Sequence, residues 1–172
     1  MNWVMPEFVE KGASVEHSQE ACQSKRSILA FVHIEKAAGT TLIHILRRNY
    51  FLRYCDVRPL RKDSDRVFRA NDMKKVLRLN PFVQCIVGHA VVPYGGLLDR
   101  YPGVRFITIM RDPVKRYVSQ FQYLTRERDH KFSFQEFLDD DHYDNFQTRK
   151  IVESGDVEEA RKVLSERFLL VG

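Results

Sequence analysis

A lysine, a glycine and two threonines lie close together in the first third of the chain, in an order that suits phosphate binding. Lys36 precedes Gly39, and Thr40 and Thr41 follow the glycine directly. An apolar run comes before this group, and apolar residues recur at helical spacing after it. Unpaired N–H groups at the start of a helix carry the positive end of its dipole and bind anions. The stretch 28–50 therefore predicts a strand, a phosphate-binding loop and a helix.

The loop differs from a Walker A motif. That motif places its lysine directly after the second glycine, with a serine or threonine next to hold magnesium. Here Lys36 precedes Gly39, the only glycine of the loop, and no hydroxyl residue follows the lysine directly. The pattern favours phosphate binding without a metal over hydrolysis of a nucleoside triphosphate. The alternative is that Gly39 only forms a turn and Lys36 is a solvated charge.

Arg111 and Ser119 form a second candidate phosphate site. Residues 104–110 are predicted to form a strand, so Arg111 stands at its carboxyl end, the edge where ligands gather in open α/β sheets. It should therefore lie on the same rim as Lys36. A guanidinium fork and a serine hydroxyl that converge there would bind phosphate. The alternatives are that Arg111 pairs with Asp112 and that Ser119 lies on an exposed helix face.

The elements that must position these residues alternate between strands and helices. Apolar runs predict strands at 28–34, 82–87 and 104–110, and a fourth apolar run begins at 168. Helices are expected after Gly39, over 71–79, and after the N-capping residues Asp112, Ser133 and Asp156. Residues 50–69 and 91–103 are expected to be irregular. This alternation predicts an α/β, P-loop-like three-layer sandwich with a mostly parallel central sheet flanked by helices.

Two of the expected helices have a predicted apolar face. In the helix after Gly39 the inward residues are Leu42, Ile45 and Leu46. In the helix after Asp112 the stripe is Val114, Tyr117, Val118, Phe121 and Leu124. For Arg116, which is not part of this stripe, an exposed helix face and a ligand contact both stay open.

Composition and charge limit the possible functions. A chain of 172 residues fits one domain, here 27–172, preceded by a polar extension at 1–26. The net charge of +5 suits an anionic ligand, but no basic run is long enough to predict a nucleic-acid partner. The three cysteines have no metal-ligand spacing, and no apolar run is long enough to span a membrane. A cytoplasmic protein without a metal site is the simplest prediction.

Two further segments complete a recognisable pattern. Val87-Gly88-His89-Ala90 and Asn145-Phe146-Gln147-Thr148-Arg149 stand in order with the Lys-x-x-Gly-Thr-Thr and Arg-Asp-Pro…Arg-Tyr-x-Ser motifs. Together they resemble the sulfotransferases that use 3′-phosphoadenosine 5′-phosphosulfate. The closer likeness is to the carbohydrate branch, which includes heparan sulfate 2-O-sulfotransferase and its bacterial relatives. The resemblance covers roughly residues 28–172. It departs at Glu35, where many relatives carry proline, and this puts a carboxylate beside the anion site.

The resemblance implies a role for each motif. It gives the 5′-phosphosulfate to Lys36, Ala38, Gly39, Thr40 and Thr41, and the 3′-phosphate to Arg111 and Ser119. It implies that His89 is the catalytic base, assisted by Lys36, and that Asn145, Gln147 and Arg149 contact the acceptor. The acceptor would be a hydroxyl of a carbohydrate or glycolipid, and no metal is needed. Because relatives continue past this point, the chain is expected to be incomplete at its carboxyl end.

Two other functions stay open at this point: a kinase-like transferase that uses ATP and magnesium, and a non-catalytic nucleotide-binding module. Several side chains also have plainer interpretations. His89 may be read as a hydrogen-bonded histidine at a strand end, and Arg149 as a partner of the acidic stretch 139–141. His33 is predicted to be packed, and the surface is the expected place of His44, His130 and His142.

Overall fold

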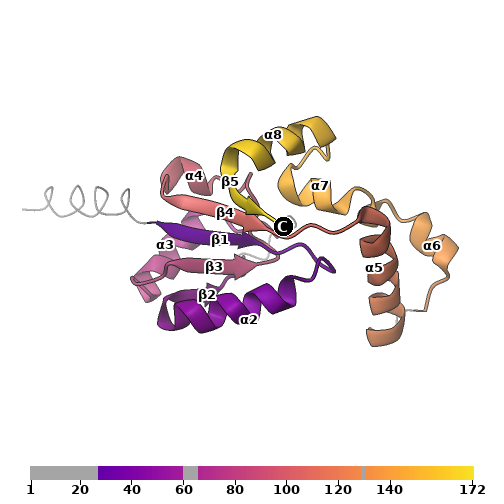
Figure 1. Cartoon of the computed structure of the whole chain (residues 1–172), viewed down its shortest axis with the longest axis horizontal. Coiled ribbons are helices and arrows are strands. Elements are labelled where there is room, and N and C mark those ends of the chain that lie inside the picture. Colours follow the sequence, from indigo (N-terminus) through magenta and orange to yellow (C-terminus); the bar gives the residue numbers. More distant parts are fainter. Residues whose placement is uncertain (1–26, 60–65, 129–130) are drawn as a thin grey trace, which may run out of the picture.

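The computed structural model describes residues 27–59, 66–128 and 131–172, so the extension predicted at 1–26 lies outside the described residues. At its centre is a five-stranded sheet in the order β2-β3-β1-β4-β5, and every pairing is parallel (Figure 1). The strands are β1 (Ile28–Val32), β2 (Tyr54–Asp56), β3 (Cys85–Gly88), β4 (Val104–Thr108) and β5 (Phe168–Val171). The predicted α/β fold with a parallel sheet between helices is confirmed.

Helices cover both faces of the sheet, and others lie beyond its carboxyl edge. They are α2 (Gly39–Tyr50), η1 (Phe51–Arg53), α3 (Ala70–Leu79), α4 (Leu97–Arg100), α5 (Pro113–Glu127), α6 (Phe134–Leu138), η2 (Asp141–Tyr143), α7 (Phe146–Ile151) and α8 (Val157–Arg167). Figure 1 shows α5 and α6 beyond the carboxyl ends of the strands, away from the sheet.

Successive residues of β1 alternate between two apolar layers. Ile28, Ala30 and Val32 face a core that includes residues of α3, α4, α7 and α8. Phe31 faces the opposite core, which it shares with Leu46 of α2. Because both faces are covered, β1 reads as a continuous apolar run instead of an alternating one. The two layers hold the loop after β1 rigidly at the carboxyl edge.

Several predicted boundaries were wrong because short elements depend on tertiary pairing. β1 ends at Val32, two residues earlier than expected, and β3 begins only at Cys85. Residues 50–69 contain the strand β2, which has three residues and is held by its pairing with β3. Residues 91–103 contain α4, a single turn. Neither is long enough to show a period in the sequence.

The predicted apolar stripe of α5 was also wrong in part. Val114 and Val118 are exposed, while Arg116 is buried. The reason is that α5 does not pack on the sheet: its Tyr117 and Phe121 rings contact Phe137 of α6. In α2, similarly, Ile45 is exposed and Ile43 takes its place against the core. The predicted N-caps hold, since Asp112, Ser133 and Asp156 each accept a backbone N–H of the following helix.

Candidate functional site

The loop after β1 leads directly into the N-terminus of α2, as predicted. Helix α2 begins at Gly39, and the loop has left-handed backbone at Lys36 (φ 63°) and Ala38 (φ 62°). Left-handed residues in a tight loop are found where successive N–H groups form an anion-binding concavity. Gly39 is required for packing, because the imidazole of His33 lies where a Cβ atom would project. Thr40 and Thr41 are exposed in the first turn of the helix.

Arg111 is held against this loop at the carboxyl end of β4. Its Nη1 donates a hydrogen bond to the carbonyl of Lys36 at 3.1 Å. Its backbone is fixed by the buried amide of Gln147, which accepts from Arg111 N at 3.0 Å and donates to Arg111 O at 2.8 Å. The structure thus brings Lys36 and Arg111 together. Gln147, expected among the acceptor contacts, has its amide bound to the peptide of Arg111.

Lys36 approaches the face of α5 that carries Tyr123. The Lys36 ammonium lies over the ring of Tyr123, 4.2 Å from its centre, a distance typical of a cation–π contact. Ser119 is half-buried and stands four residues before Tyr123, so both lie on one face of α5. The helix therefore presents the serine on the side that Lys36 approaches.

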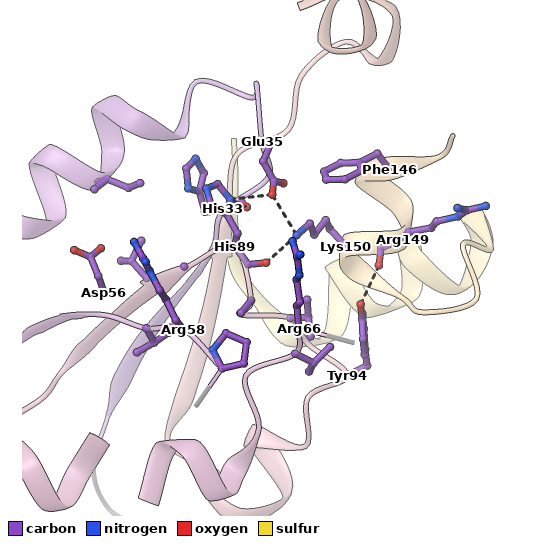
Figure 2. A pocket seen from close by; sticks show the side chains of 18 of the residues that line it. His33, Glu35, Asp56, Arg58, Arg66, His89, Tyr94, Phe146, Arg149 and Lys150 are labelled. Carbon is purple, nitrogen blue, oxygen red and sulfur yellow. Dashed lines mark hydrogen bonds and ion pairs between the residues drawn. The ribbon is translucent and has the colours of Figure 1, made fainter. Parts of the chain in front are cut away.

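His89, which follows β3, belongs to a network of side chains from three parts of the chain (Figure 2). Its Nδ1 is 3.1 Å from Glu35 Oε1 and 3.1 Å from the carbonyl oxygen of His33. Lys150 Nζ donates to the His89 carbonyl at 2.8 Å and lies 3.5 Å from Glu35 Oε1. Both partners of Nδ1 are acceptors, so in the neutral ring Nδ1 carries the proton and Nε2 is the free base.

His33 stacks on His89 with ring centres 4.1 Å apart. Burial, together with the positive charges of His89 and Lys150, lowers the pKa of His33 to about 4. His33 is therefore neutral near pH 7 and packs as predicted. Its role is to support the ring of His89 and to supply a carbonyl acceptor.

Two charged groups beside this network are incompletely satisfied. Among the described residues, Glu35 Oε2 and Arg116 Nη1 are buried without a hydrogen-bond partner. Arg116 is 2% exposed, and its Nη2 approaches the carbonyl of Tyr143 at 3.5 Å. Burial lowers the pKa of Arg116, while the charge of Glu35 acts in the opposite direction. Buried polar atoms normally have partners, so these two mark a polar gap beside the loop.

A cleft of about 1150 Å³ adjoins this network, and His89 is one of its lining residues. Figure 2 shows its wall: β1 and β3 contribute their carboxyl ends, and α7 contributes Phe146, Arg149 and Lys150. Its charged lining residues are Glu35, Arg47, Asp56, Arg58, Arg66, Arg149 and Lys150. Cations therefore outnumber carboxylates, and the walls attract negative charge.

The remaining predicted residues surround the cleft to different degrees. Arg149 lines it, and its guanidinium donates to the backbone carbonyl of Asp141 at 3.0 Å. Asn145 is the left-handed residue (φ 46°) that precedes α7, so its contribution is to the helix start. His44 is exposed, as expected, whereas the exposed His142 also lines the cleft. His130 lies outside the described residues.

Sequence reasoning missed Lys150 and underestimated Arg116 and Glu35. Glu35 was expected only as a carboxylate beside the anion site, whereas in the structure it contacts His89 and Lys150. Lys150 directly follows the segment that ends at Arg149, and no motif or spacing in the sequence marks it as a functional residue. Arg116 belongs to the Arg-Tyr-x-Ser motif, but nothing in the sequence indicated that its side chain is buried.

Two structural features bear on metals and membranes. Within residues 27–59, 66–128 and 131–172, no cluster of three or more histidine, cysteine, aspartate or glutamate side chains is arranged to hold a metal ion. In the same part of the chain, every helix is too short or too polar to cross a bilayer.

The parallel sheet with helices on both faces, and the loop and helix start after β1, define an α/β fold of the P-loop-like type. Among solved structures, this chain is similar to a sulfotransferase from Alicyclobacillus acidocaldarius, with a TM-score of 0.51 and 16% sequence identity. The alignment covers 85% of this chain and 72% of that one. No family model and no curated protein matches the sequence. The chain therefore has a sulfotransferase-like fold.

Proposed function

We propose that this protein is a sulfotransferase that moves the sulfuryl group of 3′-phosphoadenosine 5′-phosphosulfate to a hydroxyl of a carbohydrate or glycolipid. The observation that carries the proposal is the junction of Lys36 and Arg111. The loop that presents the lysine and the strand end that presents the arginine are joined by a 3.1 Å hydrogen bond. Two separated phosphate-binding groups on one rim suit a nucleotide with phosphates at both the 5′ and 3′ positions.

The residues present fit such a nucleotide. The loop residues Lys36 and Ala38 and the first turn of α2 at Gly39, Thr40 and Thr41 would hold the 5′-phosphosulfate. Arg111 and Ser119 would hold the 3′-phosphate. The unpartnered Nη1 of Arg116 offers a further donor at the edge of this gap. When bound, the nucleotide supplies an activated sulfuryl group, and the protein supplies positioning, charge and a base.

His89 is proposed as that base. Its protonated Nδ1 is held by Glu35 and the His33 carbonyl, which leaves Nε2 to accept the proton of the acceptor hydroxyl as its oxygen bonds to sulfur. Lys36 and the loop N–H groups stabilise the charge left on the departing phosphate. Glu35 acts through His89 and is a positioning residue.

The cleft beyond His89 is proposed as the acceptor site. It adjoins the proposed base, and its volume of about 1150 Å³ exceeds the range of about 300–1,000 Å³ that is typical of ligand pockets. The cleft is therefore large enough for more than one sugar ring. Its excess of arginine and lysine favours an acceptor that carries carboxylate, phosphate or sulfate groups. Arg149 and His142 are the proposed acceptor contacts. Asn145 precedes α7, the helix that carries Arg149. The side-chain amide of Gln147 holds the peptide of Arg111.

Calorimetric titration tests the nucleotide assignment. The purified chain is titrated with adenosine 3′,5′-bisphosphate, 5′-AMP and Mg-ATP, and the bisphosphate is expected to bind most tightly. Arg111→Ala should weaken the bisphosphate by about tenfold or more and leave 5′-AMP nearly unchanged, because a charge-assisted hydrogen bond contributes about 1.5–3 kcal/mol. Arg126→Ala, an exposed arginine on α5, is the control.

Equal affinity for all three nucleotides would overturn the assignment, and a preference for Mg-ATP would favour a kinase-like enzyme. Turnover is tested separately with ³⁵S-labelled cofactor and a panel of neutral and anionic oligosaccharides. Transfer that His89→Ala abolishes, with bisphosphate binding intact, supports the base. A non-catalytic module would be favoured by tight bisphosphate binding with neither transfer to any acceptor in the panel nor release of sulfate to water.

A further inference from the structure

The edge of the sheet opposite the candidate site carries an unusual group of exposed apolar side chains. Phe51 and Leu52 belong to η1, and Leu79 and Phe82 stand at the end of α3 and in the turn after it. Each of the four is between 71% and 88% exposed. We call Phe51, Leu52, Leu79 and Phe82 the apolar edge patch.

The fold places these four residues next to one another. Segment 51–53 leads into β2 and segment 80–84 leads into β3, and these two strands are parallel neighbours. The two segments are tied directly: Asn80 Nδ2 donates to Leu52 O at 2.9 Å, and Gln84 N donates to Arg53 O at 2.8 Å. The patch is therefore a fixed feature of the amino-terminal edge, and Figure 1 shows the ends of α2 and α3 on this side of the sheet.

The surroundings of the patch are basic. Segments 48–55 and 73–98 contain no aspartate or glutamate, but they contain Arg48, Arg53, Lys74, Lys75 and Arg78. Of these, Arg48 lies in the last turn of α2 and Arg78 in the last turn of α3, and both side chains are exposed. Basic residues without carboxylates on the segments that carry protruding phenylalanine and leucine side chains match one kind of surface: apolar tips enter the acyl boundary, and arginine and lysine meet lipid phosphates.

We propose that the apolar edge patch and its basic rim bind the surface of an anionic lipid bilayer. A protein partner would require complementary shape over a wide area, whereas these four side chains stand on two narrow turns. The proposal is independent of the proposed sulfotransferase activity, because the patch lies at the opposite end of the strands from His89. Binding in this way would hold the cleft facing away from the membrane.

Vesicle flotation with the full chain tests the proposal. The probes are vesicles of phosphatidylcholine alone and of phosphatidylcholine with 30% phosphatidylglycerol by design. The chain is expected to float with the anionic vesicles and much less with the neutral ones, and binding should weaken in 0.5 M salt, which shortens the range of charge attraction.

Two pairs of variants locate the contact. Leu79→Ser with Phe82→Ser should weaken partitioning into anionic vesicles by about tenfold or more, since two large apolar side chains are lost. The control pair is Leu169→Ser with Leu170→Ser on β5; these leucines are 68% and 60% exposed. They follow a segment with both glutamates and arginines, so this pair should bind vesicles as the unmodified chain does.

A third pair, Arg48→Gln with Arg78→Gln, should lower binding and its salt dependence together. Sedimentation velocity of every variant checks the competing occupant, a second copy of the chain. The proposal is overturned if the unmodified chain does not float with anionic vesicles. It is also overturned if the patch pair and the β5 pair lose vesicle binding equally. A dimer that dissociates in Leu79→Ser/Phe82→Ser, without vesicle binding, would instead assign the patch to self-association.

Discussion

Replacement of Glu35 by glutamine tests whether this carboxylate positions the proposed base. Glutamine keeps the size of the side chain but removes its charge, and it can turn an N–H toward Nδ1 of His89, 3.1 Å from the present carboxylate oxygen. The neutral imidazole would then gain from placing its proton on Nε2 instead, which would remove the free base. The change is expected to lower kcat for sulfuryl transfer.

The size of the effect follows from the geometry. A hydrogen bond to a charged group contributes about 1.5–3 kcal/mol. The side chain of His89 is 54% exposed, and Nδ1 has a second acceptor in the His33 carbonyl at 3.1 Å. Water and that carbonyl therefore still favour a proton on Nδ1 in the variant, which reduces the loss. The expected effect is therefore near the lower end of this range, about 1.5 kcal/mol, which corresponds to a loss in kcat of roughly tenfold.

Two measurements check this. Initial rates with ³⁵S-labelled cofactor give kcat, and ¹⁵N spectra of the histidine side chains report which ring nitrogen of His89 carries the proton. The affinity for adenosine 3′,5′-bisphosphate should stay within about twofold, because Glu35 contacts the base and not the phosphate sites. Glu153→Gln, an exposed carboxylate beyond α7, is the control. An unchanged tautomer, or a loss confined to nucleotide affinity, would refute the positioning role.

Three further outcomes test the site around this base. Gln147→Ala should weaken bisphosphate binding by about five- to tenfold, measured by calorimetry, because the peptide of Arg111 loses both of its amide partners. Gly39→Ala should lower the free energy of unfolding, measured in urea, by about 1–3 kcal/mol, because the new methyl group overpacks on His33. Adding His33→Ala should restore part of this lost stability. Purely additive effects of the two substitutions would show that the side chains do not clash. Since the pKa of His33 is lowered to about 4 from 6.5, the unfolded chain binds its proton first, so stability is full above pH 6.5 and falls between pH 6.5 and 4. His33→Gln should reduce that fall in urea titrations at several pH values, and an unchanged slope would show that His33 titrates normally.

Local spacing was enough to predict the part of the site that depends on one stretch of chain. The helix start at Gly39 follows from the end of an apolar run and the small residues after it. The position of Arg111 on the same rim follows from the rule that parallel strands present their carboxyl ends together. In the structure this shared rim brings the two residues close enough for the Arg111 guanidinium to donate to the Lys36 carbonyl.

Contacts between distant elements could not be predicted in this way. For Arg116 the sequence left an exposed helix face and a ligand contact open, and nothing in its helical spacing indicated that the side chain is buried. The helix lies beyond the sheet, and its buried side instead faces Phe146, 4.7 Å from the guanidinium. Lys150 reaches Glu35 only because α7 folds back over the carboxyl edge. Periodicity reports which face of a helix is apolar, but the partner of that face is set by the tertiary fold.

The loop after β1 explains how a carboxylate can stand next to an anion site. Lys36 has left-handed backbone, and its ammonium lies on the α5 side, over Tyr123. The neighbouring Glu35 points to the other side, where His89 and Lys150 surround its carboxylate. One reversal of the backbone thus separates the two charges. The positive side of the loop faces the proposed phosphate site and the negative side fixes the imidazole, so the proposed base stands at the boundary between the proposed nucleotide and acceptor sites.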